Sequence, residues 1–196
     1  MNTKFTSAPL PFQGQKRMFI KEFAHVVKET FPDASVFVDL FGGSGLLSRT
    51  AKDTLPHAKV VYNDYDRYTD RLAHIPQTNA LLARIRRIVE GEVRGQKLPE
   101  PTKQAICRYL HQRERSGDFV DTLTLSASLL FSGRFARTLD ELCGQGMYHT
   151  IVQRDYSAEG YLNGLDVLHQ DYRQVYRQYR DTPGVVFIAD PPYLHR

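Results

Sequence analysis

The strongest chemical signal in the sequence is the tetrapeptide DPPY at 190–193, an acid and two prolines followed by an aromatic residue. It comes directly after the apolar run VVFIA at 185–189, which predicts a short buried strand. Prolines stiffen the loop and remove backbone donors, so the Asp190 carboxylate and the Pro191 carbonyl present two acceptors. Two acceptors suit an NH2 group with two hydrogens to donate, and the ring of Tyr193 can stack on a planar base. We therefore predict that the tetrapeptide belongs to an active site.

A glycine-rich turn, DLFGGSG at 39–45, lies between the strand-like segment SVFVDL at 35–40 and a helical pattern at 46–54. Glycines at such a turn let the backbone bend sharply and let a ligand approach closely. The turn matches neither GxGxxG nor GxxxxGK[ST], and Asp39 would repel a polyphosphate. The ligand expected here is positively charged or zwitterionic. Taken alone, a turn of this kind more often only joins a strand to a helix.

Acidic residues also follow two further strand-like segments. Asp64 ends AKVVYND at 58–64, about 20 residues after the glycine turn, where an acid typically holds the two hydroxyls of a ribose. The alternative for Asp64 is a helix N-cap, although Asp66 is the better candidate for that cap. Asp171, within HQDY at 169–172, can contact the exocyclic amine of a bound adenine, but its spacing alone favours an N-cap.

A parallel sheet would bring these motifs together, because open α/β sheets bind ligands at the carboxyl ends of their strands. A strand, a helix and a second strand in succession predict a parallel pair with a right-handed crossover, and hence an α/β fold. In chain order the pattern predicts a helix at 16–31, a strand at 35–40, a helix at 46–54, a strand at 58–64, a strand and a helix within 164–180, and a strand at 185–189.

The middle of the chain, from 72 to 160, lacks this alternation and predicts a mostly helical insertion, with helices within 77–93 and 101–115. Residues 81–115 hold nine Lys/Arg and four Asp/Glu, a net charge of +5, whereas the whole chain carries +4. A basic segment in a near-neutral protein indicates a polyanionic partner. The alternative is a solvated helix face.

The composition is that of an ordinary globular protein of 196 residues, with 41% apolar and 24% charged residues. No apolar run approaches the ~20 residues of a membrane span, and no signal peptide follows the initial Met. We expect no membrane partner. Cys107 and Cys143 are far apart in no metal-ligand spacing, so they are expected to be free thiols in a reducing cytosol, with no metal site.

Five motifs together resemble the Dam-like (D12 class) DNA adenine-N6 methyltransferases, which use S-adenosyl-L-methionine. In the order of that family they are PFQGQKR (11–17), DLFGGSG, YNDYD (62–66), HQDY and DPPY. The resemblance implies that 1–75 and 160–196 form a discontinuous catalytic domain with a Rossmann-like parallel sheet. It also implies that 76–159 is the target-recognition insertion, which binds double-stranded DNA. LLFSGRFAR at 129–137 is similar to a stretch of that insertion, but the expected continuation is absent, so the DNA recognition sequence does not carry over.

The resemblance also implies roles for single residues. An adenine would be flipped out of the duplex and its N6 would attack the methyl group. The residues expected at S-adenosyl-L-methionine and the target-base pocket are Phe12, Gly14 and Lys16. The loop on the methionine side of the cofactor would consist of Asp39, Phe41, Gly43 and Gly45. Asp64 would hold the ribose of the cofactor, and Asp171 and Tyr172 would contact its adenine. The catalytic residues holding the target base are Asp190, Pro191 and Tyr193. The expected DNA-binding residues are Arg84, Arg87, Arg94, Lys97, Lys103, Arg134 and Arg137.

Three alternatives remain open at this stage: a cytosine-N4 methyltransferase, an RNA base methyltransferase, and a non-catalytic remnant that binds DNA or the cofactor. The family's sheet continues past the tetrapeptide, whereas only Leu194, His195 and Arg196 follow it here. We therefore expect the C-terminal strands to be missing, weak or no activity, and self-association or a longer parent chain that covers the edge strand. The resemblance further implies a cytoplasmic enzyme, bacterial or phage-encoded, of the kind found in restriction–modification.

Overall fold

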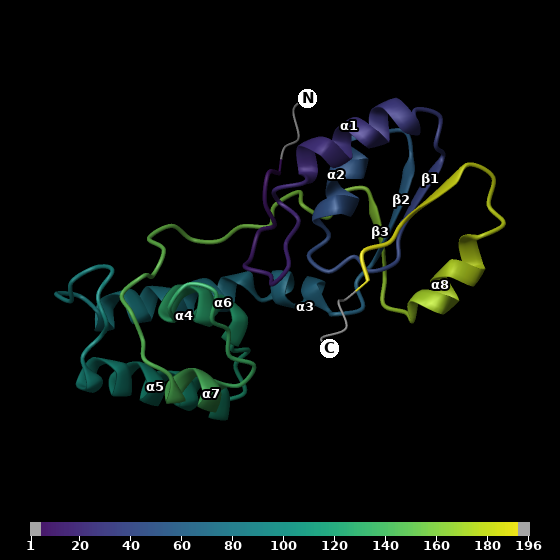
Figure 1. The fold of residues 1–196 in the computed structure, drawn as a ribbon. Helices are drawn as coiled ribbons and strands as arrows, with labels where there is room; N and C mark the ends of the chain where they lie inside the picture. Colours follow the sequence, from purple (N-terminus) through teal and green to yellow (C-terminus); the bar gives the residue numbers. More distant parts are fainter. Residues whose placement is uncertain (1–4, 192–196) are drawn as a thin grey trace, which may run out of the picture. The chain divides into compact units, whose positions relative to one another are not determined.

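The computed structural model describes residues 5–191, which form two compact units (Figure 1). The first unit comprises Met1–Asp70 and Ala158–Arg196, and the second comprises Arg71–Ser157. The first unit contains the sheet, and the second is helical. The short helix α3 (Tyr68–Ala73) lies where the chain passes from the first unit to the second.

A four-stranded, all-parallel sheet of order β3-β2-β1-β4 forms the centre of the first unit. Its register sets Val38 beside Val61 on one neighbouring strand and Phe187 on the other. This α/β architecture confirms the predicted Rossmann-like fold and all four predicted strands. The strands are β1 (Val36–Asp39), β2 (Lys59–Asn63), β3 (Leu165–Leu168) and β4 (Val185–Ile188).

Helices cover both faces of the sheet, which explains why β1 is buried at every position. On one face α1 (Ile20–Thr30) and α2 (Leu46–Thr54) contribute Val27 and Ala51 to a cluster with Phe37 and Val60. On the other face Val175 of α8 (Tyr172–Tyr179) packs with Val38 and Val61. Among the described strands β4 lies at one edge of the sheet, and it is only partly buried.

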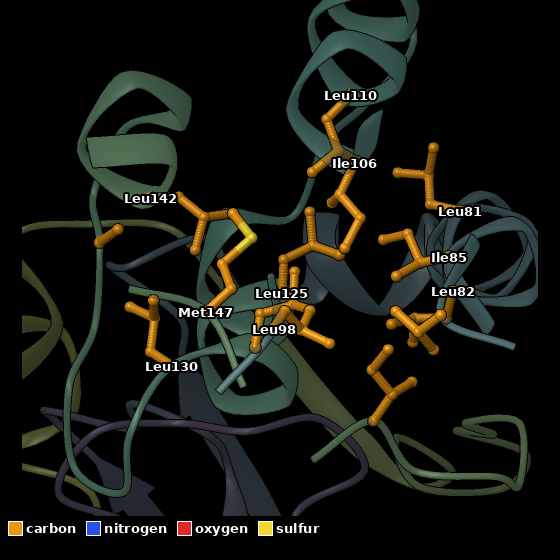
Figure 2. Packing of buried hydrophobic residues seen from close by; sticks show 14 of the residues in the cluster. Leu81, Leu82, Ile85, Leu98, Ile106, Leu110, Leu125, Leu130, Leu142 and Met147 are labelled. Carbon is orange, nitrogen blue, oxygen red and sulfur yellow. The ribbon is translucent and has the colours of Figure 1, made fainter. Parts of the chain in front are cut away.

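The second unit is a helical body around its own apolar core, with Leu81 and Ile85 of α4 facing Ile106 and Leu110 of α5 (Figure 2). A buried ion pair lies beside this core, in which the Asp121 carboxylate accepts a hydrogen bond from Arg71 Nε. The same carboxylate accepts from Thr124 N and so caps the helix α6. The helices are α4 (Ile75–Ile88), α5 (Glu100–Arg115), α6 (Thr122–Leu129) and α7 (Leu139–Gly144).

The expectation of two free thiols is wrong. Cys107 of α5 and Cys143 of α7 form a disulfide, with their Cα atoms 5.9 Å apart. The two cysteines are 36 residues apart in the sequence. They meet because α5 and α7 pack against each other through the common core, for example through Ile106 and Leu142. Such a long-range contact has no local signature in the sequence.

Within the described range 5–191, no helix has the length and apolar character needed to cross a membrane. No group of three or more His, Cys, Asp or Glu side chains in that range is arranged to hold a metal ion.

The disulfide leads to a test of the second unit. The Cys107–Cys143 bond closes a loop between residues that are 36 apart in the sequence. In the chain-entropy estimate, closing such a loop stabilises the folded state by about 4 kcal/mol at most, and often by less. Reduction, or the substitution Cys143→Ser, should therefore lower the denaturant midpoint of the second unit by an amount equivalent to about 2–4 kcal/mol. Peptide mapping without reductant should recover Cys107 and Cys143 on one cross-linked species. Two thiols that react quantitatively in the native protein would contradict the bond.

Candidate active site

The candidate site lies at the carboxyl ends of β1 and β4, which are adjacent and parallel. Asp39 is the last residue of β1, and it pairs in register with Ile188 of β4. The next residue, Leu40, donates its N–H to the Ile188 carbonyl at 3.0 Å. Asp190 follows β4 closely enough that its charge acts on the Asp39 carboxyl. The structure therefore brings the first acid of the glycine turn and the acid of the tetrapeptide into one corner.

The glycine turn is shaped by close approach as well as by backbone conformation. A Cβ atom on Gly42 would lie 2.3 Å from the ring of Tyr62, so no other residue fits there. Gly43 and Gly45 have φ values of 50° and 72°, in the left-handed region that favours glycine. The turn consequently has no side chains at these three positions, and its backbone packs closely against the rings of Tyr62 and Phe12.

Two buried tyrosines support this turn. Tyr62 Oη donates to the Gly43 carbonyl at 2.7 Å, and Tyr161 Oη donates to the Ser44 carbonyl at 2.9 Å. Burial is the main cause that raises the pKa of both phenols above the ordinary value. Both therefore stay protonated and keep donating over the physiological pH range.

Asp39 is a buried carboxyl with an unusual protonation equilibrium. It is 1% exposed, and Ser48 Oγ donates to its Oδ2 at 2.7 Å. Its pKa is raised from 3.8 to about 6, mainly by burial, and the negative charge of Asp190 contributes in the same direction. Hydrogen bonds from Ser48 and from the Phe41 backbone act in the opposite direction. A buried acid with a raised pKa in a ligand-binding corner is typical of functional sites.

Asn63, at the end of β2, was missed by the sequence analysis. Its amide nitrogen donates to the carbonyls of Leu40 and Gln170 at 3.0 and 2.9 Å, and its side-chain oxygen accepts from Gln170 N at 3.0 Å. Asn63 is fully buried and thus joins the loops after β1 and β3. The available signal was a polar residue placed directly after the buried residues Val60, Val61 and Tyr62 of β2.

The N-terminal segment also contributes to this corner, as the resemblance implies. Lys16 Nζ forms an ion pair with Asp190 Oδ2 at 3.0 Å, and both side chains are partly exposed. The Phe12 ring lies against Gly43, where a Cβ would be 3.1 Å from it. Gly14, between them, is exposed and has a φ of 78°. Phe12 and Lys16 thus reach the glycine turn and the tetrapeptide.

Asp64 has a structural role that the sequence analysis gave to its neighbour. Its carboxylate accepts from Tyr68 N at 2.7 Å, and from Thr69 N and Oγ1 at 2.8 and 2.6 Å, at the start of α3. The interpretation of Asp66 as the better cap is therefore wrong, because the first N–H groups of α3 donate to the Asp64 carboxylate. Asp64 has no exposed surface, and Asp66 is exposed. Contact between Asp64 and a ribose stays a prediction.

The residues expected around the cofactor adenine lie beyond β1 and β3. The rings of Phe41 and Tyr172 are 4.8 Å apart at an interplanar angle of 36°. Asp171 caps α8, accepting from Arg173 N at 2.9 Å, as its spacing favoured. Both Asp171 and Tyr172 are exposed, so they are open to a ligand. Their role in binding adenine stays a prediction.

Of the three residues expected to hold the target base, the structure describes two. Asp190 is half-buried in the corner beside Asp39, and Pro191 is exposed. Tyr193 lies outside the described residues.

The residues expected to bind DNA all lie in the second unit, most of them on its surface. Lys103 is the exception, because its side chain is 17% exposed and lies 3.9 Å from Glu100. Arg86 serves the fold, since it donates to the carbonyls of Val152 and Arg154 and pairs with Asp155. DNA contact by any of these residues stays a prediction. The exposed residues of the predicted set are Arg84, Arg87, Arg94, Lys97, Arg134 and Arg137.

Comparison with known proteins gives one informative likeness. The chain is similar to a protein of Haemophilus influenzae named "Putative methyltransferase". The two are 36% identical over 195 residues, which is 97% of this chain. The chain spans 65% of that relative's length. No protein-family model matches the chain, and no solved structure matches it.

The raised pKa of Asp39 predicts how stability depends on pH. Between about pH 4 and 6 the folded state holds more protons at Asp39 than the unfolded state, so this carboxyl lowers stability as the pH rises. Asp39→Asn removes the titration. From pH 7 to pH 4.5 the wild type should gain about 2 kcal/mol of unfolding free energy relative to Asp39→Asn. Denaturant unfolding at both pH values measures this difference, with the exposed Asp33→Asn as control. Parallel pH profiles for wild type and Asp39→Asn would show that Asp39 titrates normally.

Proposed function

We propose that this protein transfers the methyl group of S-adenosyl-L-methionine to the exocyclic N6 amine of an adenine in DNA. One observation carries the proposal: the Asp190 acceptor lies beside Asp39, and Lys16 Nζ holds it at 3.0 Å at the carboxyl edge of the parallel sheet. The similarity to a protein named "Putative methyltransferase" supports methyl transfer. Because the chain spans 65% of that relative, the activity, the methyl donor and the target are all proposals.

The corner fits S-adenosyl-L-methionine in shape and in charge. The backbone of Gly42 and Gly43 is partly exposed at the turn, where no side chain covers it. The carboxyls of Asp39 and Asp190 create a negative potential, which suits the cationic ammonium and sulfonium groups of this cofactor. Phe41 and Tyr172 offer aromatic surface to its adenine. When bound, the cofactor supplies a methyl group made electrophilic by the positive sulfur.

Asp190 can hold both Lys16 and the target amine. A carboxylate has about four lone-pair sites on its two oxygens. Lys16 approaches Oδ2, so the other oxygen can accept one N–H of the amine, and the Pro191 carbonyl can accept the second. Lys16 would keep the Asp190 carboxylate oriented.

Accepting both hydrogens favours a pyramidal amine whose lone pair is withdrawn from the ring and is more nucleophilic. With S-adenosyl-L-methionine bound, its sulfonium would supply the methyl group to the amine nitrogen, and Asp190 or water would take the proton that the methylated nitrogen loses. Correct positioning of the two reacting atoms supplies much of the acceleration. Because the amine is paired inside a duplex, the adenine must first be flipped out at a cost of a few kcal/mol.

Transfer of labelled methyl from S-adenosyl-L-methionine to DNA, followed by nucleoside analysis, tests the proposal directly. N6-methyl-2′-deoxyadenosine is the expected product nucleoside. Labelled N4-methylcytosine, or label found only in RNA, would show that the target is a different base, while methyl transfer itself would stand. Binding of the cofactor or DNA without any transfer would identify a non-catalytic remnant and overturn the proposal.

Asp190→Ala should lower the transfer rate at least about 100-fold, because the amine loses its charged acceptor. Affinity for S-adenosyl-L-methionine, measured by calorimetry, should change little. Asp181→Ala removes an exposed acid shortly before β4 and serves as the matched control. An Asp190→Ala protein that methylates adenine at the wild-type rate would remove Asp190 from the mechanism.

Lys16→Met should lower kcat about tenfold, since Asp190 loses the partner that orients it. Lys16→Arg should restore part of the rate, because it keeps a cation near the carboxylate. Lys21→Met, on the exposed side of α1, is the control for loss of one positive charge. If Lys16→Met raised only the KM for DNA, Lys16 would be a DNA contact and would not position Asp190.

A further inference from the structure

The surface of α5 carries a hollow of about 580 Å³, and the disulfide-bonded Cys107 is one of the residues that line it. Arg108, His111 and Arg115 line it too, together with two glutamines and a serine. Cys107, His111 and Arg115 follow one another at intervals of four residues, which places them on one face of the helix. A volume of this size is in the range of small-molecule sites. The hollow belongs to the second unit and is separate from the candidate active site.

The hollow reaches the disulfide from the side of Cys107. This residue is half-buried, whereas its neighbour Ile106 is fully buried in the core that also contains Leu142 of α7 (Figure 2). Among the described residues that line the hollow, Cys143 is absent. A thiolate that enters the hollow therefore meets the Sγ atom of Cys107.

The hollow is positively charged. Arg108 and Arg115 are exposed, and neither takes part in an ion pair among the described residues of α5 and its surroundings. His111 differs, because its ring nitrogens lie 3.7 Å from the Glu114 carboxylate and 3.6 Å from that of Asp140. None of the described lining residues is acidic. Guanidinium groups bind carboxylates in a two-pronged geometry, so the hollow suits a ligand that carries carboxylates.

The spacing of the two arginines indicates the length of that ligand. Arg108 and Arg115 are seven residues apart, which corresponds to about 10 Å along the axis of α5. A ligand that reaches both arginines carries a carboxylate near each of its ends, as a short peptide with an acidic side chain does. Positive charge beside a disulfide also attracts an incoming thiolate.

We propose that the hollow binds a small peptide thiol with two carboxylates, which reduces the Cys107–Cys143 bond where it is bound. Arg108 and Arg115 hold the carboxylates while the thiolate attacks Cys107 Sγ. The inference goes beyond the proposed function and does not rest on it.

The reaction consists of two thiol–disulfide exchanges. In the first, the thiolate forms a bond to Cys107 Sγ, the bond between the two cysteines breaks, and Cys143 Sγ leaves with the electron pair and takes up a proton. In the second, another molecule of the thiol attacks the mixed disulfide, and Cys107 Sγ leaves. Two molecules of the thiol are oxidised to one disulfide, and the two cysteines are reduced to thiols.

Reduction removes the covalent link between α5 and α7, which lie side by side (Figure 1). The second unit then loses the stabilisation that the closed loop provides. The stability of this unit would thus follow the supply of a carboxylated thiol.

The test compares the rates at which the oxidised protein is reduced by glutathione and by glutathione diethyl ester, which has the same thiol but masked carboxylates. Alkylation followed by peptide mapping measures the Cys107 and Cys143 thiols that form over time. At low salt, glutathione should reduce the wild type about tenfold faster than the ester does, and high salt should lower this ratio. Arg108→Gln and Arg115→Gln should each lower the ratio about threefold, and the double variant should bring it to about one.

Arg113→Gln is the matched control, because Arg113 is an exposed cation of α5 that does not line the hollow. Its ratio should equal that of the wild type. Dithiothreitol is uncharged and should reduce the wild type and all variants at the same rate, since the bond itself is unchanged. Equal rates with glutathione and its ester in the wild type, or a ratio that survives in the double variant, would overturn the proposal. Full alkylation of both cysteines before any reductant is added would overturn it as well.

Discussion

The candidate site depends on one buried amide, the side chain of Asn63. It donates two hydrogen bonds and accepts one, and so joins the loops that follow β1 and β3 across the end of β2. Only an amide side chain offers both kinds of hydrogen bond in this geometry, since a carboxylate could not donate to Leu40. An aspartate there would leave two buried carbonyls unsatisfied, and an apolar residue would leave three groups unsatisfied. The Asn63 side chain therefore helps to fix the glycine turn relative to Asp171, together with the backbone bond from Gly42 N to the Asn63 carbonyl.

At the same edge of the sheet, buried negative charge destabilises the folded protein, and a cationic ligand can reduce this destabilisation. Asp39 is buried beside a second acid, Asp190, and its raised pKa expresses chiefly the penalty of burying its charge, to which the negative charge of Asp190 adds. Lys16 offsets part of this charge from the more exposed side. A positively charged group that binds near Asp39 would stabilise its ionised form and release the proton held there near pH 6. The corner is therefore prepared for a cation before any ligand arrives, at the expense of stability at neutral pH.

How much could be predicted from the sequence depended on the range of the interaction. The strands were predictable because parallel strands are covered on both faces and appear as apolar runs such as VFV at 36–38. The glycine turn and the acids near it were predictable because their chemistry is local. The helix α1 begins at Ile20, later than the predicted start at 16, since an apolar period does not mark a helix boundary. The cap by Asp64 and the Cys107–Cys143 bond depend on exact reach and on helix packing, which local patterns do not contain.

The basic residues of the second unit also show that a local sequence pattern does not reveal which side chains pair in the fold. The nine basic residues of 81–115 suggested a polyanionic partner, but three of them, Arg86, Lys103 and Arg113, pair with Asp155, Glu100 and Asp118. Arg86 in addition satisfies two backbone carbonyls, so it belongs to the fold more than to the surface. A net charge counted along the sequence therefore overstates the field available to a partner, because paired cations contribute little beyond a Debye length. The cations that no described ion pair neutralises, such as Arg94 and Arg134, are therefore the ones whose charge remains available to a partner.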